Sequence, residues 1–129
     1  MDTANQQRIL GYFIEEAKEH LQTLEQGILQ LATSVKDTET VNEMFRAAHS
    51  VKGGAAMLGY TSIQKTAHRL EDSFKILKDN PVDVDQKLET LFLNGYDHLQ
   101  DLIDRLESSA NFSDSDAVEI LAQAESNFA

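Results

Sequence analysis

The sequence contains no cysteine and no tryptophan, and it has a single proline, Pro81, in 129 residues. Without cysteine, a disulfide framework and a thiolate metal site are both excluded. Because proline interrupts helices, its scarcity leaves long stretches free to be helical. No apolar run approaches the roughly 20 residues needed to span a bilayer, and no charged-then-apolar signal segment opens the chain. We therefore expect a cytoplasmic protein that is not bound to a membrane.

Basic residues are also scarce. The chain has 11 Lys and Arg against 22 Asp and Glu, which gives a formal net charge of −11. This balance argues against binding to nucleic-acid backbones and to anionic membranes. Hydrophobic residues make up 41% of the sequence, which is enough for a core in a chain of this length. With no internal repeat and no linker composition, residues 1–129 are expected to form one domain.

Apolar residues recur every three or four positions along most of the chain, which is the period of an amphipathic helix. No strand-like alternation persists. The pattern predicts helices at roughly residues 8–32, 40–58, 61–79, 84–107 and 116–127, with residues 1–7 frayed. The expected inward stripes include Ile9 in the first helix, Phe45 in the second and Leu91 and Gly95 in the fourth. The short polar connections predict an all-α, antiparallel up-and-down four-helix bundle with a fifth short C-terminal helix.

Several helix ends are marked by local signals. Gly59 is expected to be a left-handed C-cap, and Asn80 before Pro81 should end the third helix. The expected N-terminal capping pairs are Thr40 with Glu43 (or Asp37 or Thr38 as the cap instead), Thr61 with Gln64, and Asp83 with Gln86.

The second predicted helix carries two adjacent glycines, although each interior glycine costs about 1 kcal/mol relative to alanine. His49, Lys52, Gly53 and Ala56 fall at i, i+3, i+4 and i+7, so they share one helical face. That face offers a nucleophile and a cation, followed by almost no side chain. We interpret it as a docking surface, centred on Gly53 and Ala56, from which a partner protein can reach His49.

The hairpin formed by the second and third helices brings further polar residues to this level. In an antiparallel pair whose turn is centred near residue 60, His49 and Glu71 are each 11 positions from the turn, and Lys52 and His68 are each 8 positions from it. His68 and Glu71 also share a face because they are three residues apart. The spacing predicts a cluster of His49, Lys52, His68 and Glu71 on one flank.

This cluster suits the carriage of a phosphoryl group. Neutral imidazole is a nucleophile, and a carboxylate that accepts a hydrogen bond from one ring nitrogen leaves the lone pair of the other exposed. Glu71 is placed to orient His49, and Lys52 supplies a cation for phosphate oxygens. No glycine-rich nucleotide-binding loop lies between a strand and a helix, so the chain is not expected to bind ATP itself.

At these residues the sequence resembles the histidine-containing phosphotransfer (HPt) domain, most closely the version at the N-terminus of chemotaxis-type histidine kinases. The matching motif is His49-Ser50-x-Lys52-Gly53-Gly54-Ala55-x-x-Leu58-Gly59, followed by His68-x-x-Glu71. The resemblance implies that His49 is phosphorylated, that Glu71 holds its ring, and that Lys52 and His68 support the site.

The resemblance also implies two partners: a histidine-kinase ATP-binding domain as phosphoryl donor and an aspartate on a response-regulator receiver as acceptor. We expect no cofactor in this chain, since the Mg²⁺ for the second step is expected to come with the receiver. The isolated domain is expected to be a monomer, either free-standing or part of a larger kinase.

Two other functions are open to the same residues. The bundle can be a helical adaptor that binds partners without chemistry. It can also be a metal site built from His49, His68 and Glu71, although Lys52 would repel a cation there, and none of the four histidines has a Glu three residues before it, as in diiron bundles.

Overall fold

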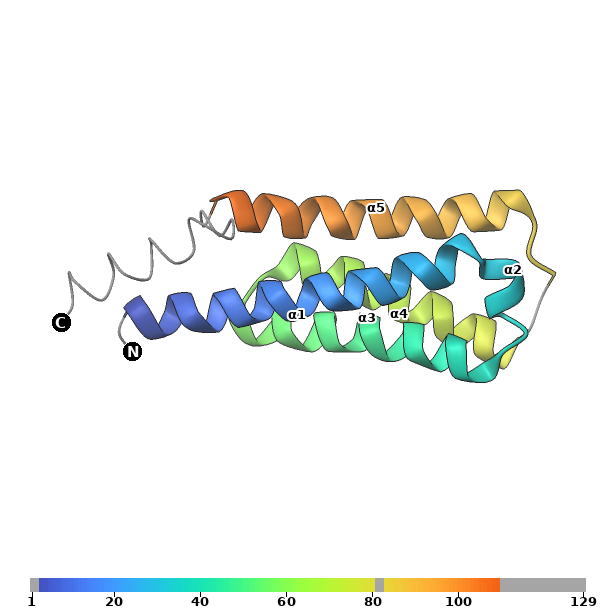
Figure 1. Ribbon diagram of the computed structural model, residues 1–129, viewed down its shortest axis with the longest axis horizontal. Helices are drawn as coiled ribbons and strands as arrows, with labels where there is room; N and C mark the ends of the chain where they lie inside the picture. Colours follow the sequence, from blue (N-terminus) through green and yellow to red (C-terminus); the bar gives the residue numbers. More distant parts are fainter. Residues whose placement is uncertain (1–2, 81–82, 110–129) are drawn as a thin grey trace.

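The computed structural model describes residues 3–80 and 83–109, and all of the regular structure in this part of the chain is helical. The helices are α1 (Thr3–Leu29), α2 (Leu31–Ser34), α3 (Thr38–Leu58), α4 (Thr61–Asp79) and α5 (Gln86–Ser109). The four long helices run up and down as an antiparallel bundle, with the short α2 at one end (Figure 1). Helix α3 packs against α1 and α4, and α5 closes the ring by packing against the same two helices. The predicted bundle is confirmed, whereas the helix expected at 116–127 lies outside the described residues.

Helix α1 is longer at its start than predicted, since it begins at Thr3 rather than at residue 8. Ile9 was wrongly placed inside: it is exposed, and Leu10 and Ile14 continue the buried stripe in its place. The helix also stops at Leu29, and a separate turn of helix follows. That turn is fixed by Ser34, whose buried hydroxyl donates a hydrogen bond of 2.8 Å to the carbonyl of Gly27.

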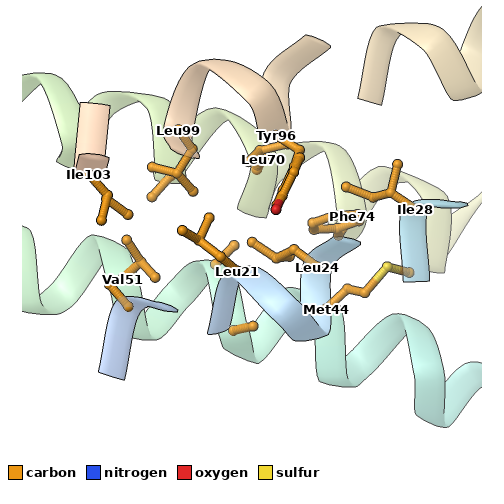
Figure 2. Packing of buried hydrophobic residues seen from close by; sticks show 14 of the residues in the cluster. Leu21, Leu24, Ile28, Met44, Val51, Leu70, Phe74, Tyr96, Leu99 and Ile103 are labelled. Atoms are coloured by element: carbon orange, nitrogen blue, oxygen red, sulfur yellow. The ribbon is translucent and has the colours of Figure 1, made fainter. Parts of the chain in front are cut away.

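A single stripe per helix fills the core, and Figure 2 shows side chains from α1, α3, α4 and α5 meeting there. In α5 the fully buried positions are Phe92, Tyr96, Leu99 and Ile103. The predicted inward position of Leu91 was therefore wrong, because the neighbouring Phe92 buries more surface and stacks on Phe74 with ring centroids 5.3 Å apart. The helix is rotated accordingly.

The helix ends use different caps from those predicted. Asp37, one of the alternatives considered, caps α3 by accepting a 3.1 Å hydrogen bond from the backbone N–H of Glu39. Tyr60 precedes α4 without a side-chain cap. At α5, Asp85 rather than Asp83 accepts from the backbone N–H of Leu88 at 2.8 Å. Three expected caps were wrong because each helix begins two or three residues away from the proposed pair or at its first member.

The connection between α3 and α4 was predicted correctly. Gly59 has φ = 79°, in the left-handed region, and the backbone N–H of Tyr60 donates to the carbonyl of Ala55 at 2.8 Å. Only Gly59 and Tyr60 separate the two helices. A reversal this short aligns α3 and α4 along their length, and it thereby sets which of their residues face each other. No helix in the described ranges is long and apolar enough to cross a membrane.

Candidate functional site

The paired helices α3 and α4 bring His49, Lys52 and Glu71 into direct contact. The His49 Nδ1 atom lies 2.5 Å from Oε2 of Glu71, and the Lys52 ammonium donates to Oε1 of the same carboxylate at 2.8 Å. Both carboxylate oxygens are therefore occupied by residues of the neighbouring helix. The level match predicted between positions 49 and 71 is present in the structure as a hydrogen bond.

Burial separates the two ends of this arrangement. Glu71 is only 7% exposed, although a carboxylate is rarely buried without partners. The His49 side chain is 61% exposed. Because Nδ1 faces the carboxylate and Nε2 has no hydrogen-bond partner among the described residues, Nε2 is the nitrogen that is left for chemistry.

The electrostatics of Glu71 keep it ionised. Burial on its own raises the pKa of this carboxyl, but the hydrogen bonds from Lys52 and His49 outweigh burial, and the pKa lies below its ordinary value. An ionised Glu71 accepts and cannot donate, so Nδ1 must carry the proton between the two groups. The neutral ring is then the tautomer whose lone pair is on Nε2.

Phe45 also contacts the imidazole, which was not foreseen from the sequence. Its ring lies nearly parallel to that of His49, with centroids 6.2 Å apart and an angle of 11° between the planes. Phe45 was predicted to be a core residue, and it is half-buried against the core. The available signal was the i, i+4 spacing of the two rings on one helix.

His68 lies beside this group and contacts a different residue. Its Nε2 atom is 3.4 Å from a carboxylate oxygen of Asp72, one turn along α4, and both side chains are more than half exposed. Lys52 contacts Glu71, and no contact with His68 accompanies it. The structure therefore places His68 next to the cluster but on its solvent side.

The part of the chain that the structure describes contains one group of three side chains that could together ligate a metal. Their ligand atoms, from His68, Glu71 and Asp72, lie within 4.8 Å of one another. His49, which was part of the alternative metal site considered above, is not in this group. Both oxygens of Glu71 already accept hydrogen bonds, one of them from the Lys52 ammonium. Such an environment argues against a divalent cation.

The two adjacent glycines serve different purposes. A methyl group added to Gly53 would meet nothing within 4 Å, whereas one added to Gly54 would lie 2.8 Å from the ring of Phe13 in α1. Gly54 is thus required for the packing of α1 against α3. Gly53 leaves the surface beside His49 open, and Ala56 and the 87% exposed Met57 continue that surface.

The family profile of the Hpt domain matches residues 8–125. The chain is 35% identical over 112 residues to chemotaxis protein CheA of Klebsiella aerogenes, covering 87% of this chain and 17% of that protein. It is 34% identical over 94 residues to the protein of the same name from Bacillus subtilis, covering 73% of this chain and 14% of that one. The chain thus spans less than a fifth of the length of these curated relatives.

Two solved structures are similar to the fold described above. The CheA phosphotransferase domain from Thermotoga maritima has a TM-score of 0.68 and 32% identity, with 78% of this chain and 95% of that chain covered. The phosphorylated P1 domain of CheA3 in complex with CheY6, from R. sphaeroides, has a TM-score of 0.67 and 25% identity, with 94% and 95% covered. The chain therefore belongs to the Hpt domain family, and within it is similar to the phosphotransfer domain of CheA.

Proposed function

We propose that His49 of this Hpt domain is the residue that carries the phosphoryl group in a phosphorelay. The observation that carries the proposal is the hydrogen bond between Nδ1 of His49 and the buried, ionised Glu71, with Nε2 unpartnered. Of the four histidines in the chain, His49 is the one that contacts a buried carboxylate in the described ranges. Orientation and charge stabilisation are what phosphoryl transfer requires of a protein.

The first step is an in-line attack by the lone pair of Nε2 on the terminal phosphorus of ATP, held by a separate histidine-kinase ATP-binding domain. The Nε2–P bond forms, the P–O bond to the β-phosphate breaks, and ADP leaves. In the second step an aspartate oxygen of a receiver attacks the phosphorus, the N–P bond breaks, and its electron pair returns to Nε2. Mg²⁺ accompanies the partners, and this chain needs no cofactor of its own.

Each neighbour of His49 has a part in this mechanism. Glu71 keeps the proton on Nδ1 and stabilises positive charge on the ring as the N–P bond forms. An ammonium has three donors, and only one contact of Lys52 is taken by Glu71, so the others can meet phosphoryl oxygens. His68 has a supporting role through its charge, because it lies beside the carboxylate without bonding to the imidazole.

The receiver docks on the open face of α3. Gly53 presents no side chain, Ala56 is exposed, and Met57 offers an apolar contact. The P1 domain of CheA3 from R. sphaeroides, which is similar to this chain, was crystallised in its phosphorylated form with CheY6, and this supports a response regulator as partner. We further propose that the domain acts as a monomer in the cytoplasm, where ATP-dependent donors operate.

Transfer to a receiver distinguishes this function from that of an adaptor. The chain is labelled with radioactive ATP and a histidine-kinase catalytic domain, separated from both, and mixed with purified receivers. We expect the label to leave the chain and appear on a receiver, and His49→Gln to give neither labelling nor transfer while it still binds that receiver. Loss of function in the cell without loss of binding in His49→Gln supports the carrier, whereas full function in that variant identifies an adaptor.

A further inference from the structure

The imidazole of His49 is held from two directions. The hydrogen bond to Glu71 fixes the line that joins Nδ1 to the carboxylate, but it leaves the ring free to rotate about that line. The second restraint is the ring of Phe45, which lies nearly parallel to the imidazole at an angle of 11°. Offset parallel packing of two rings is a preferred arrangement that resists such rotation.

Phe45 is suited to this task because it is itself anchored. It lies one helical turn before His49 on α3, and it packs against the buried core while it remains half-exposed. The His49 side chain is mostly exposed, so it has no other packing to hold its plane. Among the described residues, His49 is the one histidine that has an aromatic ring against it.

We propose that Phe45 is a positioning residue that fixes the plane of the His49 ring and thereby aims the Nε2 lone pair at the incoming phosphorus. The lone pair lies in the plane of the imidazole, so rotation about the Nδ1 hydrogen bond swings it away from the line of attack. This inference rests on the proposed function of His49. It assigns to Phe45 no contact with the phosphoryl group.

The proposal predicts a dependence on the kind of donor. A docked kinase domain holds its phosphorus at a fixed place, so a loosened ring spends less time aligned, and labelling falls by about tenfold. Phosphoramidate, a small donor, can approach from any direction. With it the Nε2–P bond forms, the donor's N–P bond breaks and ammonia leaves, and the rate should stay within a factor of about two, because no fixed alignment is needed.

The test compares Phe45→Leu, which removes the flat ring, with Phe45→Tyr, which keeps it. Leu58→Ala is the matched control, since Leu58 is another half-buried residue of α3 that packs on the core. Each variant is labelled by a histidine-kinase domain with ATP and, separately, by phosphoramidate, with thermal unfolding measured in parallel. We expect Phe45→Leu to lower the rate at saturating kinase domain, and Phe45→Tyr and Leu58→Ala to retain it.

NMR relaxation of the His49 ring carbons gives a readout that does not depend on any donor. We expect greater ring motion in Phe45→Leu than in the wild type or Phe45→Tyr. Equal ring motion in all three, or kinase labelling of Phe45→Leu at the wild-type rate, overturns the proposal, as does an equal loss with both donors. If the wild type is not labelled at all, the proposed function of His49 fails, and the relaxation data alone decide whether Phe45 restrains the ring.

Discussion

Replacing Glu71 by glutamine tests the orientation of His49 with little change in shape. In the native protein one carboxylate oxygen faces Nδ1 of His49 and the other faces the Lys52 ammonium. The amide has a single acceptor oxygen, so it can serve one of these donors and must turn its NH₂ group toward the other. If NH₂ faces Nδ1, that nitrogen must accept, the ring proton moves to Nε2, and the attacking lone pair is lost.

The size of the effect follows from the strength of the contacts that are lost. Hydrogen bonds to a charged group contribute about 1.5–3 kcal/mol, and about 1.4 kcal/mol corresponds to a factor of ten. We therefore expect Glu71→Gln to be labelled roughly 10- to 100-fold more slowly than the wild type. The free energy of unfolding should fall by only about 1–2 kcal/mol, because the partly exposed Lys52 can turn to water.

The assay is the initial rate of labelling by a histidine-kinase domain with ATP, with chemical denaturation in parallel. Asp72→Asn is the matched control. It removes the same charge one residue further along α4, where the side chain is exposed and pairs with His68. Labelling of Glu71→Gln at the wild-type rate, or an equal decrease in both variants, refutes the orienting role of Glu71.

Other predictions follow from the same contacts. Gly53→Ala should stabilise α3 by about 0.5–1 kcal/mol, because the added methyl group meets nothing, whereas Gly54→Ala should destabilise by about 1–3 kcal/mol against the ring of Phe13; thermal unfolding checks both. Gly53→Leu should block transfer to the receiver in a pulse-chase assay while the helical CD spectrum is kept. Lys52→Gln should slow labelling less than Glu71→Gln, since the Nδ1 contact survives. Because the pKa of Glu71 is lowered on folding, its contribution to stability is present at neutral pH and is lost as the pH falls below the ordinary carboxyl range, so urea unfolding of the wild type and Glu71→Gln should converge in acid.

The contact between His49 and Glu71 could be predicted because it depends on one turn. A left-handed glycine at position 59 fixes the centre of the reversal, and counting from there gives the residues at equal height. The same counting did not identify the partners of Lys52 and His68. Height does not specify direction around a helix, and the long side chain of Lys52 reaches a full turn along α4 to Glu71.

The bundle itself could be predicted from the apolar period, but the rotation of individual helices could not. Where two apolar residues are adjacent, as Leu91 and Phe92 are, the period permits either to face inward. The packing decides, and here the larger ring of Phe92 lies against Phe74. The stacking of Phe45 on His49 was missed for the related reason that the exposed edge of a half-buried ring leaves no mark on the pattern.

The most direct test of this account is to find where the phosphate is attached after incubation with a histidine-kinase domain and ATP. Mass spectrometry locates the modified residue, and its stability in acid and base identifies the bond. The account predicts an acid-labile, base-stable phosphate on His49 and none on His20, His68 or His98. A phosphate on another residue, or an acid-stable one, would contradict it.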